Sequence, residues 1–421
     1  MIGRVPEPRK AALARVREPR SGEVIDEALA LWFPGPNSET GEDMAELQLH
    51  GGRAVIAAVL AALGRLEGLR MAEPGEFTRR AFENGRLDLT AVEGLADLIA
   101  ADTEAQRRQA FRQLKGLLGD RAEGWRKRLI EALALVEARI DFSDEADVPD
   151  DLVGSALHAA AMLRSEIEEV LGDARRGERL REGLVVAIAG PPNAGKSTLL
   201  NRIARREAAI VSAIPGTTRD VIEVHLDLEG APVTVLDTAG IRVSNDPVER
   251  EGVSRARARA GEADLVLWVV DSSDDSSGKE VHSIKNRPSQ QVWLIENKFD
   301  LARTKSAGKI KNECKYPFSN RFSVSALSGE GMNHLMNEIS KYTAAFVSST
   351  EGAVITRARH RRALEEAVAA LKRAGVEGRA AREDIVAEEL RLAARALGRL
   401  TGRVDVEDIL DVIFRDFCIG K

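Results

Sequence analysis

The sequence predicts a multidomain protein that is α/β plus all-α, in which an α/β domain is inserted into a discontinuous helical domain and an α+β domain precedes both. The chain has 421 residues, enough for two or three domains at roughly 150 residues each. Hydrophobic residues make up 44% and aromatic residues only 4%, which favours helices and an aliphatic sheet. The periodicity of the apolar residues also changes along the chain, and these changes set the predicted boundaries.

The α+β domain is predicted over residues 1–84. Residues 28–33 form an apolar run that stops at a turn rich in proline and glycine. Residues 46–50 alternate as a strand does, and residues 54–66 have helical spacing.

The helical domain is predicted in two parts, residues 85–182 and 344–421. Apolar residues three and four apart indicate helices in the first part: Phe111, Leu114, Leu117, Leu118, then Leu129, Ile130, Leu133, Val136 and Ile140. In the second part a seam alternates spacings of four and three: Val386, Leu390, Ala393, Leu397 and Leu400. Gly402 is the predicted stop of that helix. We expect the two parts to pack on each other.

The α/β domain is predicted over residues 183–343. It begins with a continuous apolar strand, Leu184–Ala189, as a parallel sheet covered on both faces requires. Further strands are predicted at 233–236, 265–270, 292–295 and 322–325.

Charge and cysteine content exclude some classes of protein. A net charge of −6 excludes a basic surface over the whole chain. Two cysteines, Cys314 and Cys418, do not form a disulfide framework. No apolar run reaches the roughly 18 residues of a membrane span. We therefore expect a cytoplasmic protein.

Residues 190–197 read GPPNAGKS and match GxxxxGK[ST], directly after a predicted strand and before a helical run. Glycines let backbone N–H groups surround phosphate oxygens, while Lys196 reaches the outer phosphates and the Ser197 hydroxyl binds Mg²⁺. A glycine-rich turn with no ligand is the alternative. The predicted nucleotide-binding residues of this loop are Asn193, Ala194, Gly195, Lys196, Ser197 and Thr198.

Companion motifs follow at the ends of later predicted strands. In DTAG the Asp237 carboxylate holds the water shell of magnesium and the Gly240 amide contacts the γ-phosphate, with Thr238 and Ala239 between them. In NKFD, Asn297 and Lys298 precede Asp300, whose carboxylate accepts both guanine N–H groups and so rejects adenine.

Two more segments complete the pattern. Ser325, Ala326 and Leu327 can present a backbone amide to the guanine carbonyl oxygen. Residues 216–220 (GTTRD) lie where a switch loop supplies a threonine to magnesium. The order and spacing of all five motifs resemble a Ras-like P-loop GTPase domain, which implies GTP and Mg²⁺.

The residue that positions the attacking water is not evident. Ile241 stands where many small GTPases carry a glutamine, and an apolar side chain cannot orient water. Glu249 is a candidate, although an exposed acid in a switch region is the favoured reading from the residues alone.

The chain resembles the MnmE (TrmE) family of tRNA-modification GTPases over essentially its whole length. The resemblance rests on the terminal FCIGK, on residues 74–89, and on the turns at 33–37 and 40–43. It implies an N-terminal domain that binds a tetrahydrofolate one-carbon donor and forms a homodimer. It also implies that the protein, with MnmG, an FAD-dependent partner, adds a carboxymethylaminomethyl or aminomethyl group to C5 of wobble uridine in certain tRNAs.

The resemblance also assigns a potassium site that replaces an arginine finger. Its K⁺ ligands are Asn193, Ser212, Ile214 and Thr217, within the loop Ser212, Ala213, Ile214, Pro215, Gly216, Thr217 and Thr218. Ser197 and Thr218 match the magnesium ligands. Glu249 matches the family's water-orienting acid, which reverses the reading above.

In the folate pocket, Glu46 and Lys421 match positions that contact the cofactor, and Arg86 keeps the positive charge of a family lysine. Cys418 is either a functional thiol near the folate and tRNA site or a small buried hydrophobe.

The chain departs from the family pattern in three places. The opening strand with its Arg-Ile-Ser-Gly context is absent, so the folate domain is expected to be incomplete at its start. Glu39 replaces an aromatic residue, and the segment 274–296 is short. Two other functions stay open: a ribosome-assembly GTPase of the Era or Der kind, and a GTP-binding scaffold without modification activity.

Overall fold

The computed structural model describes residues 1–142, 151–206, 223–237, 263–272, 290–302, 318–348, 352–404 and 413. The chain divides into two compact units. The first unit comprises Met1–Ile99, Phe111–Ile167 and Arg362–Lys421, and the second comprises Ala100–Ala110 and Glu168–Arg361.

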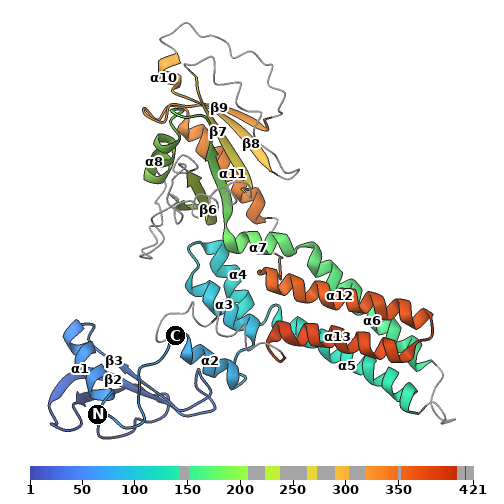
Figure 1. Ribbon diagram of the computed structural model, residues 1–421. Coiled ribbons are helices and arrows are strands. Elements are labelled where there is room, and N and C mark those ends of the chain that lie inside the picture. Colours follow the sequence, from blue (N-terminus) through green and yellow to red (C-terminus); the bar gives the residue numbers. More distant parts are fainter. Residues whose placement is uncertain are drawn as a thin grey trace, which may run out of the picture. The chain divides into compact units, whose positions relative to one another are not determined.

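The first unit begins with a three-stranded antiparallel sheet and a helix beside it (Figure 1). Every second side chain of a strand lies on the same face, and on one face Val16 and Ala28 pack against Val59 of the helix. These elements are β1 (Ala12–Arg17), β2 (Val24–Phe33), β3 (Met44–Gln48) and α1 (Arg53–Leu63).

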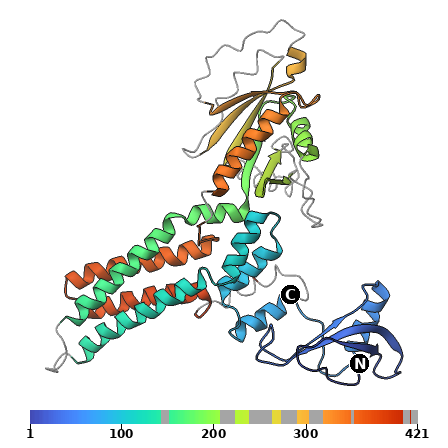
Figure 2. The same cartoon turned by 180° about the vertical axis from the view of Figure 1, so that it is seen from behind.

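The long helices of the two predicted helical parts lie side by side in both views (Figures 1 and 2). Ion pairs at the bundle surface join neighbouring helices, and those in which both side chains are exposed contribute little to stability because water screens them. The pairs are Arg128–Glu166 at 2.8 Å, Arg391–Glu137 at 2.8 Å and Arg373–Glu389 at 2.7 Å. The helices are α5 (Gly119–Asp141), α6 (Leu152–Gly172), α12 (Ala358–Arg379) and α13 (Glu383–Thr401).

The seam predicted on α13 is confirmed. Leu390 and Leu400 are 0% exposed, and α13 packs along α5, so helices from the two predicted parts do meet. On α5 the buried stripe is Ala122, Trp125, Leu129, Ala132 and Val136. The stripe therefore keeps two of the residues predicted there, whereas Ile130 and Ile140 are exposed. Gly402 caps α13 in the left-handed conformation.

The helical pattern predicted for residues 85–182 is interrupted more often than its apolar spacing indicates. One helix ends at Leu114 and the next begins at Gly119, so Leu117 and Leu118 lie in the turn between them. Leu118 is fully buried there, because a turn can bury a leucine as well as a helix can. The shorter helices are α2 (Glu76–Glu83), α3 (Leu89–Ile99), α4 (Glu104–Leu114) and α7 (Ala174–Glu182).

The second unit contains a six-stranded sheet of order β5-β6-β4-β7-β8-β9. β5 runs antiparallel to β6, and every other neighbouring pair is parallel. The strands are β4 (Leu184–Ala189), β5 (Glu223–Leu228), β6 (Ala231–Asp237), β7 (Leu265–Asp271), β8 (Gln291–Asn297) and β9 (Asn320–Ser323). The prediction that the last strand reaches residue 325 is wrong by two residues, because the Ser325 N–H turns to the Glu330 carbonyl.

Both faces of this sheet are covered by apolar side chains. On one face Leu199 and Ile203 of α8 (Lys196–Arg206) and Leu335 of α11 (Met332–Ser348) pack against alternate residues of β4. On the other face Ala187, Val266 and Trp268 form a second cluster. The alternation explains why β4 reads as a continuous apolar run.

Strand β4 lies between β6 and β7, where the strand order changes direction. Ligands of open α/β sheets bind beyond the carboxyl ends of the strands at such a point. In the part of the chain that the structure describes, no helix is long and apolar enough to cross a membrane.

Candidate nucleotide site and a second pocket

The predicted phosphate loop connects β4 to α8. The Lys196 ammonium donates to the carbonyl oxygens of Gly190 (2.8 Å) and Pro191 (2.7 Å), so its side chain lies along the loop and is 8% exposed. A Cβ on Gly190 would collide with the Val269 carbonyl, and one on Gly195 would collide with Asn297. The loop therefore needs glycine at both positions and leaves backbone amides at a helix N-terminus, where anions bind.

Asn193 occupies an unusual backbone conformation in this loop. Its φ is +62°, in the left-handed region that non-glycine residues adopt at a cost. The residue is exposed, as are Ser197 and Thr198 at the start of α8. An exposed carboxamide held in a constrained loop is suited to offering its oxygen to a ligand.

Asn297 connects two of the predicted motifs. Its Nδ2 donates to the Ala194 carbonyl at 2.9 Å, and its Oδ1 accepts the Ala326 N–H at 2.9 Å. The side chain is 2% exposed, so both bonds are protected from water. One carboxamide thus ties the phosphate loop to the loop that begins at Ser325. The segment Ser325–Leu327 is predicted to present a backbone amide to the base, and of its amides the Ala326 N–H has Asn297 as its partner in this structure.

The NKFD segment is anchored to the neighbouring strand. Lys298 has φ +61°, and its ammonium lies 2.6 Å from the Asp271 carboxylate at the end of β7. The Ser272 hydroxyl donates to the Asn297 carbonyl at 2.6 Å. These bonds place Asp300, half-buried in α10 (Phe299–Ala302), at the edge where the parallel strands end.

The loop after β9 is closed by its own backbone and by one residue that the sequence did not single out. The Gly329 N–H donates to the Ser325 carbonyl at 2.8 Å. Arg202 of α8 donates from Nη2 to the carbonyl of Leu327 at 3.0 Å, while the Leu327 side chain is 79% exposed. Arg202 belongs to none of the predicted motifs. The sequence pointed to it only through its position on the helix that follows the phosphate loop.

Other predicted site residues can be placed only in part. Asp237 ends β6 in register with Ile188 of β4. Outside the described residues lie Ser212, Ala213, Ile214, Pro215, Gly216, Thr217, Thr218, Thr238, Ala239, Gly240, Glu249, Cys418 and Lys421. No group of three or more His, Cys, Asp or Glu side chains within the described ranges could hold a metal ion.

A second site lies in the N-terminal part of the first unit. A cavity of about 330 Å³ brings together Glu46 of β3 and Arg86, both predicted from the family resemblance. Glu39, identified above as a departure from the family pattern, is also part of its wall. The complete lining is Arg9, Phe33, Asn37, Ser38, Glu39, Met44, Glu46 and Arg86. The cavity therefore offers charges of both signs beside two apolar side chains.

A phosphate loop at the switch point of a parallel sheet, with NKFD and Ser325–Leu327 segments at the same edge, defines a P-loop GTPase. Comparison with known proteins gives the family. The MnmE helical domain matches residues 89–418, and the domain described as the GTP-binding protein TrmE N-terminus matches residues 2–86. The chain belongs to the MnmE family of tRNA modification GTPases and is a GTP hydrolase.

Named relatives agree with this assignment. The tRNA modification GTPase MnmE of Rhodopseudomonas palustris is 58% identical over 421 residues, which cover 100% of this chain and 92% of the relative. The tRNA modification GTPase MnmE of Parvibaculum lavamentivorans is 55% identical, covering 98% of this chain and 91% of the relative. Membership of this family disfavours the Era or Der alternative.

Solved structures give weaker matches. The G domain of the T. maritima FeoB iron transporter is 26% identical, covers 38% of this chain and 98% of that chain, and has a TM-score of 0.29. At such a score the match adds no argument about function.

Proposed function

We propose that the chain is a potassium-activated GTPase that works with MnmG to modify C5 of wobble uridine in tRNA, using a folate one-carbon donor. The observation that carries the nucleotide part is the Asn297 bridge between the phosphate loop and the Ser325 loop. Because one buried side chain connects the two segments, the phosphate and base subsites of one nucleotide are held together.

The binding roles follow from the chemistry of each group. Lys196 exchanges its loop carbonyl partners for the outer phosphate oxygens of GTP. The hydroxyls of Ser197 and Thr218 are magnesium ligands, and the Asp237 carboxylate holds the ion's water shell. Such a site needs no cluster of protein carboxylates, because Mg²⁺ keeps several waters and takes phosphate oxygens. Thr198, Thr238, Ala239 and Gly240 belong to the same phosphate-binding edge.

Guanine selection is assigned to the other end of the site. The Asp300 carboxylate accepts the two guanine N–H groups, and an adenine there would leave the carboxylate without those donors. Lys298 and the Ser325–Leu327 segment form the surroundings of the base.

The potassium ligands are Asn193 with Ser212, Ile214 and Thr217, from the loop that also contains Ala213, Pro215 and Gly216. The donor set fits a monovalent cation, since carboxamide, hydroxyl and carbonyl oxygens are all neutral. Bound there, the ion would supply a positive charge beside the negative charge that develops on the phosphate oxygens in the transition state for phosphoryl transfer. Glu249 orients the attacking water, which Ile241 cannot do.

The second pocket is proposed as the folate site. A reduced folate carries a pterin with N–H donors, an apolar aromatic linker and a glutamate tail with carboxylates. Glu46 is suited to the donors and Arg86 to the carboxylates, because charge-assisted hydrogen bonds are the strong ones. Its volume of about 330 Å³ lies in the usual range of ligand pockets. Lys421 and Cys418 are assigned to the same region.

The partners are also part of the proposal: a homodimer formed through the N-terminal domain, MnmG and tRNA. The relatives are named as tRNA modification GTPases. The domain boundaries proposed for this function are 1–84, 85–182, 183–343 and 344–421, with the G domain inserted between the helical parts.

Glu249 gives a direct test of the proposed hydrolysis mechanism. Glu249→Ala should bind a fluorescent GTP analogue as the wild type does, yet lose at least about 100-fold in single-turnover hydrolysis, the range typical of a positioned acid or base. Glu251→Ala is the matched control and should hydrolyse GTP normally. A fully active Glu249→Ala protein would remove the assigned role.

A further inference from the structure

One wall of the second pocket has no regular secondary structure. Asn37, Ser38 and Glu39 line the cavity, and the segment 34–43 between β2 and β3 contains only turns and bends. The position of such a segment depends on side-chain bonds to its neighbours, because no ladder of backbone bonds fixes it.

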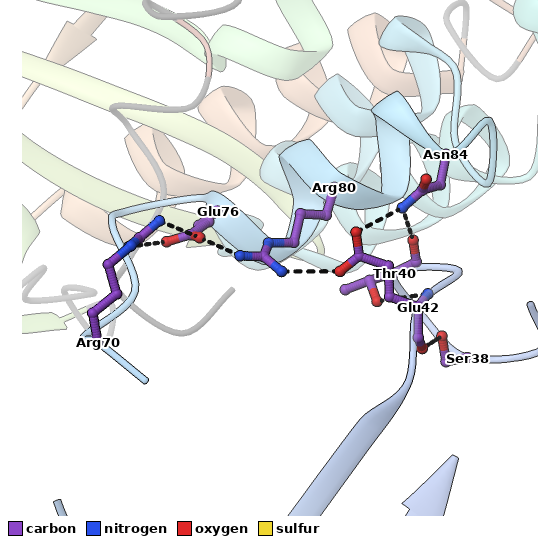
Figure 3. A network of polar contacts seen from close by, with 7 residues as sticks. All are labelled: Ser38, Thr40, Glu42, Arg70, Glu76, Arg80 and Asn84. Atoms are coloured by element: carbon purple, nitrogen blue, oxygen red, sulfur yellow. Dashed lines mark hydrogen bonds and ion pairs between the residues drawn. The ribbon is translucent and has the colours of Figure 1, made fainter. Parts of the chain in front are cut away.

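Two residues from the region of α2 hold this segment (Figure 3). Asn84 donates from Nδ2 to the Thr40 carbonyl at 2.9 Å and to Glu42 Oε1 at 3.3 Å. Arg80 donates from Nη1 to Glu42 Oε2 at 2.9 Å. Within the segment, the Ser38 hydroxyl donates to the Glu42 carbonyl. The bonds to Glu42 therefore reach Ser38, which lines the cavity.

A second set of hydrogen bonds, made by Glu76, holds Arg80, the arginine that contacts Glu42. Glu76 accepts from Arg80 at 2.8 Å and from both terminal nitrogens of Arg70, at 2.8 and 2.7 Å (Figure 3). Hydrogen bonds, first those from Arg70, lower the pKa of Glu76 to about 2. The hydrogen bond from Arg80 is the main cause that lowers the pKa of Glu42. Glu42 and Glu76 are therefore negatively charged at neutral pH, and Arg70 and Arg80 carry the matching positive charges.

The same segment is in direct contact with a residue of the pocket. Gly41 has φ +84°, and a Cβ there would lie 3.0 Å from Asn84 Cβ and 3.3 Å from Arg86 Cγ. Arg86 lines the cavity. The bend at Gly41 thus packs against both Asn84, which holds the segment, and Arg86, which is assigned to the ligand.

We propose that Glu42, Arg80 and Asn84 form a clamp that positions the pocket wall and Arg86, and so sets the affinity of the pocket for a reduced folate. These are positioning residues: the cavity lining does not include them. The inference rests on the proposed function of the pocket as a folate site, and it gives a role to three residues to which the family resemblance assigned none.

Ligand affinity is the first measurement. Binding of 5-formyltetrahydrofolate to the full-length chain should weaken about tenfold in Asn84→Ala and Glu42→Gln, because each loses hydrogen bonds that hold the wall. The matched control is Glu27→Gln, which removes another exposed carboxylate–arginine pair, to Arg15 at 2.6 Å, away from the cavity. Its affinity should equal that of the wild type. Arg86→Ala, a pocket-lining variant, should abolish binding.

Hydrogen–deuterium exchange of peptides from residues 34–44, without ligand, is the second measurement. Exchange should accelerate in Asn84→Ala and Glu42→Gln while the urea midpoint stays near that of the wild type. Unchanged exchange in both variants overturns the clamp, whatever the ligand does.

The outcomes separate the clamp from the folate site itself. If Arg86→Ala abolishes binding and both clamp variants bind normally, the clamp is wrong and the folate site stands. If the wild type shows no saturable binding, the folate site is wrong, and the proposed effect on folate affinity fails with it even where exchange accelerates.

Discussion

At the scale of single residues, Asn297 has the largest consequence for the nucleotide site. Asn297→Ala leaves the Ala194 carbonyl and the Ala326 N–H without their partner in a dry environment, at about 1–3 kcal/mol per unsatisfied group. We expect a lower unfolding midpoint in urea and at least a tenfold loss in GDP affinity. Asn337→Ala, on an exposed position of α11, is the control. A variant with wild-type GDP affinity would contradict the bridging role.

Substitution of Arg202 tests the second contact that holds the loop beginning at Ser325, which is assigned to the guanine base. Its guanidinium donates to the Leu327 carbonyl from a partly exposed position, so we assign the bond about 1 kcal/mol. Arg202→Ala should therefore weaken GDP binding about fivefold without altering the phosphate contacts. Arg205→Ala, exposed on the same helix, should change nothing. Isothermal titration of GDP onto both variants measures this difference. Equal GDP affinities would show that Arg202 does not hold the loop.

At the scale of elements, the α5–α13 seam is the clearest structural test. Leu390 is fully buried, whereas Leu392, on the same helix, is 38% exposed. Leu390→Ala should destabilise the helical part by about 2–5 kcal/mol through the cavity that it leaves. Leu392→Ala should cost no more than about 0.5 kcal/mol. Urea unfolding followed by circular dichroism compares the two, and equal midpoints would show that the seam is not a core.

The same elements show what periodicity can and cannot predict. The α13 seam was predictable because its apolar residues have one dominant period, and β4 was predictable because its residues form an unbroken apolar run. Strand β1 was not predicted, because two of its three inward residues are small (Ala12 and Ala14, beside Val16) and arginines occupy the alternate positions Arg15 and Arg17. The break between α4 and α5 was missed because Leu118 is buried in a turn and continues the helical spacing.

The two candidate sites differ in how much of each could be predicted from the sequence. The phosphate loop could be assigned from its sequence because glycine, lysine and serine at that spacing are typical of a loop that binds nucleotide phosphates. The placement of Glu46 and Arg86 in one pocket was predicted from the family resemblance, since the two residues are 40 positions apart and no pattern connects them. Arg202, Asn84 and Arg80 act through backbone carbonyls or through other side chains, and the sequence assigned none of them a site role, although Arg80 and Asn84 lie in the segment 74–89 that resembles the family.

At the scale of the whole molecule, the two sites belong to different compact units. The phosphate loop lies in the second unit, and the pocket of Glu46 and Arg86 lies in the first. Because the described parts of the two sites share no residue, substitutions in them should act separately. Arg86→Ala should leave GTP turnover by the isolated chain unchanged, and Asn193→Ala should leave 5-formyltetrahydrofolate affinity unchanged. A loss of both activities in either variant would show that the sites are coupled.

The most direct test of the central claim is GTP turnover by the full-length chain in potassium chloride and in sodium chloride at equal ionic strength. We predict at least about tenfold faster turnover in potassium, because the ion stabilises charge in the transition state. The difference should vanish in Asn193→Ala and persist in Asn201→Ala, an exposed asparagine of the adjoining helix. Equal rates in the two salts for the wild type would contradict the account.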